Sequence, residues 1–118
     1  MTRVTFTKGE NLPYERIQTE GHSGYGEEGT DIICAAISSA TELVVNILEQ
    51  FSIDLDIEVD EEAPSVLVLI LDGENNRKKK DTVKNIVEGY KGYITDLAEA
   101  YPEFIEISAE NKSQKAAK

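Results

Sequence analysis

The chain contains one cysteine, Cys34, one histidine, His22, and few positive charges for its length. A single cysteine excludes an intramolecular disulfide, and with it the disulfide-rich scaffolds of secreted proteins. No apolar run approaches the roughly 18 residues that a membrane-spanning helix needs. The opening residues, MTRVTFTKGE, lack the apolar segment of a signal peptide. We therefore expect a cytoplasmic protein that does not act in a membrane.

Positive charge is scarce, because 12 lysines and arginines stand against 23 aspartates and glutamates, for a net charge of −11. This balance disfavours binding to the phosphate backbone of nucleic acids as the main task, so we expect no direct nucleic-acid partner. It favours basic partners, although an acidic surface also serves solubility alone. Residues 77–80 form a basic run, RKKK, which we expect to be a solvated loop because cations oppose the dipole at a helix start.

The pattern of apolar residues predicts one domain with a single core, which a chain of 118 residues can bury. Strands are predicted at residues 2–7, 14–20, 53–60, 65–73 and 104–108, and helices at about 31–50, capped by Thr30 or Asp31, and about 81–101. The order β-β-α-β-β-α-β predicts an α/β (α+β) fold with two main helices on one sheet. We expect residues 1–108 to form the domain and residues 109–118 to be a polar, disordered tail.

Two of the predicted strands differ in character. In IDLDIEVD, residues 53–60, apolar residues alternate strictly with acidic ones, which predicts a half-buried strand with one wet, acidic face. Residues 65–73 are almost continuously apolar, which predicts a strand covered on both faces or lying at a subunit interface.

A glycine-rich loop, residues 21–29, contains His22 near its start and lies ahead of Cys34 in the chain. The predicted helix start puts Cys34 in the first turn, where free N–H groups and the helix dipole stabilise a thiolate. A thiolate and an imidazole are the minimal pair for nucleophilic attack on an acyl carbon, and free amides there could form an oxyanion hole. Asp31, one turn before Cys34, is a candidate to orient the histidine or to cap the helix.

The composition of this loop suits a segment that opens for a substrate and closes on it, because glycines lose much conformational entropy when they are ordered. We therefore assign these residues to a mobile substrate loop: Gly21, Ser23, Gly24, Tyr25, Gly26 and Gly29. Two other interpretations stay open: a lone cysteine in an apolar helix is ordinarily a small buried side chain, and a lone loop histidine is ordinarily solvated. One cysteine and one histidine make a poor metal ligand set, so we expect no metal and no cofactor.

The residues Gly21-His22, a short glycine-rich loop and DIICAAIS at residues 31–38 resemble the ribosomal-processing cysteine protease family, Prp. The sequence pattern of this family is roughly GHA, then a loop, then DIVCAAVS. The resemblance covers nearly the whole chain. The resemblance implies a homodimeric endopeptidase that removes the N-terminal extension of the precursor of ribosomal large-subunit protein twenty-seven. It makes Cys34 the nucleophile and His22 the general base and then acid, with Asp31 and Ser38 as supporting candidates. Ser23 departs from the family's more usual alanine.

A basic ribosomal precursor fits the acidic face of residues 53–60, which could steer it, and the apolar residues 66–71 could supply a dimer interface. One alternative is a non-catalytic acidic binding module, or a ribosome-assembly factor for a basic ribosomal protein, in which Cys34 is inert. A second alternative is a hydrolase or transferase that uses the same pair of residues on a small acyl substrate.

Overall fold

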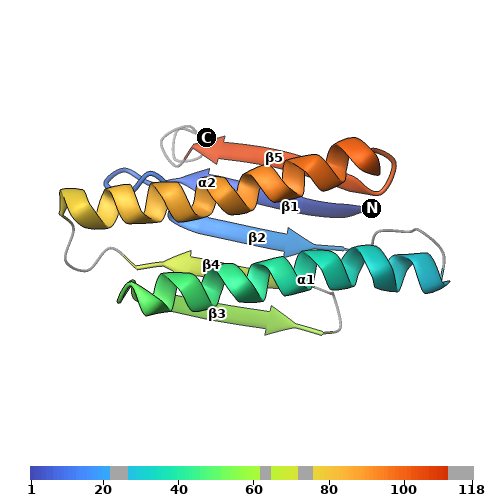
Figure 1. Ribbon diagram of the computed structural model, residues 1–118, viewed down its shortest axis with the longest axis horizontal. Coiled ribbons are helices and arrows are strands. Elements are labelled where there is room, and N and C mark those ends of the chain that lie inside the picture. Colours follow the sequence, from blue (N-terminus) through green and yellow to red (C-terminus); the bar gives the residue numbers. More distant parts are fainter. Residues whose placement is uncertain (22–26, 62–64, 72–75, 112–118) are drawn as a thin grey trace.

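The computed structural model describes residues 1–21, 27–61, 65–71 and 76–111, with only the backbone of residues 27–31. The predicted order of elements is confirmed (Figure 1). The elements are β1 (Thr2–Lys8), β2 (Arg16–Glu20), α1 (Glu27–Gln50), β3 (Leu55–Asp60), β4 (Ser65–Ile70), α2 (Arg77–Ala100) and β5 (Ile105–Asn111).

The five strands form one mixed sheet in the order β3-β4-β2-β1-β5. Neighbouring strands are antiparallel except β1 and β5, which are parallel. Both helices lie on one face of this sheet, α1 along the β3–β4 half and α2 along the other half (Figure 1). The fold is therefore a two-layer α+β sandwich, and in the described part of the chain the second sheet face carries no helix.

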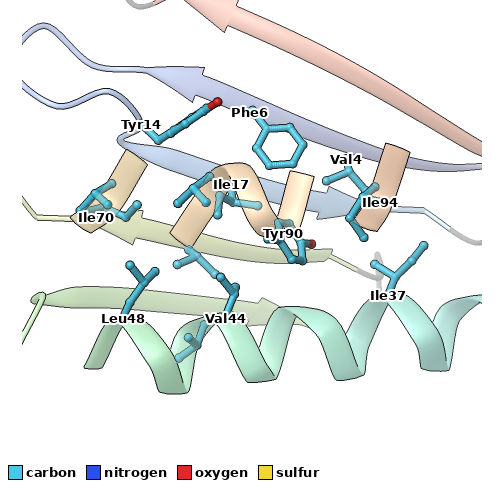
Figure 2. Packing of buried hydrophobic residues seen from close by; sticks show 14 of the residues in the cluster. Val4, Phe6, Tyr14, Ile17, Ile37, Val44, Leu48, Ile70, Tyr90 and Ile94 are labelled. Carbon is cyan, nitrogen blue, oxygen red and sulfur yellow. The ribbon is translucent and has the colours of Figure 1, made fainter. Parts of the chain in front are cut away.

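The core fills the space between the sheet and the two helices (Figure 2). Alternate strand residues point into it, among them Val4, Phe6 and Ile17. The helices contribute one stripe each: Ile33, Ile37, Val44 and Leu48 from α1, and Val83, Val87, Tyr90 and Ile94 from α2. Each fully buried aliphatic side chain stabilises the fold by about 1.5–3 kcal/mol.

One buried polar contact joins the helices inside this core. The hydroxyl groups of Thr41 and Tyr90 are 2.8 Å apart and share a hydrogen bond, and the Thr41 hydroxyl lies 2.8 Å from the Ile37 carbonyl oxygen. Burial raises the pKa of the Tyr90 phenol, and its hydrogen bond to Thr41 opposes part of that rise. Tyr90 is therefore held neutral while its ring packs against Phe6.

Both helices begin earlier than the sequence predicted. Helix α1 starts at Glu27, so Gly29 belongs to its first turn and not to the loop. Helix α2 starts at Arg77, so the basic run is its first turn and the predicted solvated loop is wrong. The Asn76 side chain caps α2 by accepting a hydrogen bond from the Lys79 amide (2.8 Å). Such a cap stabilises a helix by about 1 kcal/mol, which offsets much of the unfavourable dipole interaction.

The strands also depart from the prediction. Strand β4 lies inside the sheet with helices on one face only, so Val68 and Ile70 are buried while Leu67 and Leu69 are half-buried. Coverage of this strand on both faces is therefore wrong for the single chain. Strand β5 continues to Asn111, which places residues 109–111 in the sheet, and residues 112–118 lie outside the described part.

The apolar side of β3 is half-buried at its first residue, Leu55, and exposed beyond it. Ile57 is 42% and Val59 is 63% exposed, although their alternation with acidic residues predicted burial. The reason is topological, because among the described strands β3 is an edge strand with β4 as its one neighbour.

Helix α1 is apolar over much of its surface. Its segment Ile32–Gln50 has the length and composition of a membrane-spanning helix, contrary to the expectation from sequence. A core helix passes the same test, and α1 packs Ile33, Ile37 and Leu48 into the core. Packing against the sheet and α2 thus accounts for its apolar character.

Candidate active site

Cys34 is the eighth residue of the 24-residue helix α1 and is half-buried. Its neighbours on the helix define the core stripe, since Ile33 is 2% and Ile37 is 1% exposed. At 100° per residue, Cys34 lies at the border of that stripe, where one side of the thiol meets the core and the other meets solvent. Partial exposure is typical of reactive cysteines, whereas inert structural cysteines are fully buried.

The early start of α1 changes the electrostatic setting of this thiol. Cys34 lies about 10 Å along the helix axis from Glu27, at 1.5 Å per residue. The helix dipole acts mainly within the first turn, and the free N–H groups are those of the first four residues. The predicted position in the first turn is therefore wrong, and the amides around Cys34 belong to the interior of the helix. Any oxyanion donors must come from elsewhere or from the first turn.

Gly21 ends the segment that leads from β2 to the histidine. Its φ is +86°, in the left-handed region that favours glycine. A Cβ atom at this position would lie 2.7 Å from the carbonyl oxygen of Met1, so a side chain has no room. The glycine was assigned to a mobile loop, and its conformation gives it a second task, which is to turn the chain immediately before His22.

The other predicted site residues divide into two groups. His22, Ser23, Gly24, Tyr25 and Gly26 lie outside the described residues, and Asp31 is described through its backbone in α1 alone. Ser38 is exposed and lies four residues after Cys34, so both side chains lie on the same flank of α1. In the described part of the chain, no three histidine, cysteine or acidic side chains come together to hold a metal ion.

An apolar groove between α1 and α2 was not predicted from the sequence. It has a volume of about 600 Å³, and among its lining residues are Ala36, Ala40, Leu43, Ile86 and Tyr93. Leu43 is 60% and Tyr93 is 46% exposed, which is unusual for such large apolar side chains. The sequence feature that could have predicted this groove is the width of the apolar stripe of α1, which is wider than the sheet alone can cover. Because this groove lies on the α2 side, Cys34 and Ser38 occupy the opposite flank of α1.

Comparisons with known proteins agree with this fold. A family model described as cysteine protease Prp matches residues 1–106. SMU.848 from Streptococcus mutans is 28% identical, with 95% of this chain and 96% of that chain covered and a TM-score of 0.71. The essential ribosomal processing protease Prp from S. aureus, in complex with a covalently linked product peptide, is 23% identical, with 93% and 100% covered and a TM-score of 0.71. The S. aureus protease with a substrate peptide is 22% identical, with the same coverage and a TM-score of 0.70. A search of curated proteins gives no match.

Proposed function

Because the chain belongs to the family of the cysteine protease Prp, whose model matches residues 1–106, we propose that it is a cysteine endopeptidase for a ribosomal protein. Its substrate is the precursor of ribosomal large-subunit protein twenty-seven, from which it removes the N-terminal extension in the cytoplasm. The observation that carries the proposal is Cys34, the only thiol of the chain, half-buried on a flank of α1 within the matched span.

The proposed reaction proceeds through an acyl-enzyme. The Cys34 thiolate attacks the scissile carbonyl carbon, a C–S bond forms, and the carbonyl electron pair moves to oxygen. When this intermediate collapses, the C–N bond breaks and the His22 imidazolium donates its proton to the leaving amine. His22 then takes a proton from water, whose oxygen attacks the thioester; the C–S bond breaks, and the carboxylic acid product leaves and loses its proton to solvent. The thiolate and the imidazolium are thereby restored, and neither a metal nor a cofactor takes part.

A peptide substrate is favoured over a small acyl compound by the structural relatives. The S. aureus protease has been crystallised with a substrate peptide and with a covalently linked product peptide. Both complexes support peptide-sized access and a covalent enzyme species in this chain as well. The net charge of −11 supports a basic partner, which a ribosomal protein is.

We place the proposed homodimer interface on the apolar groove and not on residues 66–71, because β4 lies inside the sheet. A second copy that packs its own helices there would cover Leu43 and Tyr93. Leu43→Glu should then shift the protein toward monomer in analytical ultracentrifugation. Asn46→Glu, at an exposed α1 position outside the groove lining, should not.

The experiment that tests the activity mixes the purified protein with the N-terminally extended precursor and identifies the products by mass spectrometry. Wild type should make one cut, Cys34→Ala should make none, and Asn46→Ala, at an exposed α1 position away from the proposed site, serves as the control. In parallel, iodoacetamide should alkylate Cys34 rapidly in wild type and slowly in His22→Ala. If the precursor stays intact and binds wild type and Cys34→Ala equally, the protease proposal is wrong and the binding module takes its place.

A further inference from the structure

The outer edge of β3 offers unpaired backbone groups. Among the described strands, β3 pairs with β4 alone. The Leu71 amide donates to the Asp54 carbonyl oxygen (2.9 Å), which fixes the hydrogen-bonded positions of the ladder at Asp54, Asp56, Glu58 and Asp60. Because such positions alternate in an antiparallel pair, the N–H and C=O groups of Leu55, Ile57 and Val59 point to the open edge.

The side chains along this edge form two strips of different chemistry. Asp56, Glu58 and Asp60 are exposed on the sheet face that carries no helix. Ile57 and Val59 are exposed on the helix side, at 42% and 63%. An extended segment added to the edge would therefore meet carboxylates on one face and apolar groups on the other.

A second copy of the chain is a poor occupant of this edge. In an antiparallel pairing of two β3 strands, residues directly opposite share a face, so Glu58 would meet an acidic residue in every register. Like charges in directly opposite positions destabilise a strand pair. The same arrangement favours a strand that carries basic residues at alternate positions.

The C-terminal end of β3 lies on the side of the fold that also holds the N-terminal half of α1. Strand β3 runs antiparallel to α1, and the C-terminal end of β3 lies beside the N-terminal half of α1 (Figure 1). Cys34 lies in the first third of α1, on the flank away from the groove to α2. Because α1 covers the β3–β4 half of the sheet, that flank is the one on the side of β3 (Figure 1).

We propose that the substrate binds by adding an extended segment, antiparallel, to the outer edge of β3. This inference rests on the proposed protease function. An antiparallel segment starts at the Cys34 end of β3 and runs away from it, so the residues on the C-terminal side of the scissile bond pair with the edge. Basic side chains at alternate positions contact Asp56, Glu58 and Asp60, and the residues between them contact Ile57 and Val59. Backbone pairing supplies affinity and the alternating side chains supply specificity.

Amide hydrogen exchange tests the pairing directly. Cys34→Ala protein is measured by NMR with and without a 15-residue synthetic peptide that spans the cleavage site. The amides of Leu55, Ile57 and Val59 should exchange at least about 10-fold more slowly with peptide, whereas those of Asp56 and Glu58, already bonded to β4, should change little. Uniform or absent protection along β3 overturns the proposal. Protection without peptide that grows with protein concentration also overturns it, because a second copy then occupies the edge.

A backbone substitution provides an independent test. Ile57→Pro removes an N–H that points outward, away from β4. The hydrogen bonds between β3 and β4 are therefore kept, which is the condition under which edge strands accept proline. Loss of one hydrogen bond should raise the Kd of the peptide about 2- to 10-fold. Ile57→Val, which keeps the N–H and an apolar β-branched side chain, should stay within about 2-fold. Circular dichroism of both variants verifies the fold, and equal Kd values for the two would contradict strand addition.

The acidic strip is tested by charge removal in the active enzyme. Glu58→Gln with Asp60→Asn should raise KM about 3- to 10-fold at low salt, with kcat unchanged and the effect lost at 0.5 M salt. Glu99→Gln with Glu103→Gln, the same charge change at exposed positions away from β3, is the control. If wild type does not cleave the precursor, the protease function itself fails. If wild type cleaves and both double variants behave alike, only the binding mode proposed here fails.

Discussion

Replacing Gly21 with alanine should destabilise the protein and lower its activity. With φ at +86°, an alanine at this position costs about 1–3 kcal/mol of backbone strain. Its Cβ would also lie 2.7 Å from the Met1 carbonyl oxygen, so one of the two segments must move. The lower conformational entropy of the unfolded alanine chain returns about 0.4–1 kcal/mol. The net loss should be about 1–2 kcal/mol, which lowers Tm by about 4–12 °C.

The matched control is Gly92→Ala, the same chemical change inside α2. No atom lies within 4 Å of a Cβ at that position, and no unusual φ is required. Alanine is the better helix former by about 0.5–1 kcal/mol, so Tm should rise. Thermal unfolding followed by circular dichroism compares the two variants with wild type. If Gly21→Ala melts within 1 °C of wild type, or both variants change in the same direction, the reasoning about Gly21 is wrong.

Three further perturbations probe the core and the helix start. Burial raises the pKa of Tyr90, so the free energy of unfolding should fall above about pH 10, where the unfolded chain ionises this tyrosine and the native one does not. Urea midpoints from pH 8 to 11 should show a smaller fall in Tyr90→Phe, with the rest due to Tyr14, whose pKa burial also raises. Asn76→Ala should cost about 1 kcal/mol in urea unfolding, because the Lys79 amide loses its side-chain acceptor, whereas Asn76→Asp should not destabilise. Leu48→Ala, at a position with 0% exposure, should cost about 2–5 kcal/mol, and a loss below 1 kcal/mol would contradict the core described here.

Local pattern was a good guide to the elements and a poor guide to their ends. The 3.6-residue and two-residue periods of apolar residues predicted both helices and all five strands in the right order. The predicted starts of the helices were wrong because side-chain capping and packing also act at a helix start and can outweigh the unfavourable interaction of basic residues with the helix dipole. Asn76 caps a basic first turn that the charge argument alone excludes from a helix. Residues 27–29, which were assigned to the glycine-rich loop, belong to α1.

The sequence alone determined the order of elements and supplied Cys34 and His22 as the proposed catalytic pair, because these depend on residue type and on neighbours within a few positions. Only the tertiary structure decided which surfaces are covered. Strand order makes β3 an edge with Ile57 exposed, and places both helices on one face with Leu43 uncovered. The close approach of Met1 to Gly21 likewise joins chain segments twenty positions apart. Contacts of this kind depend on which strands become neighbours in space, and the local spacing of apolar residues in the sequence does not predict that.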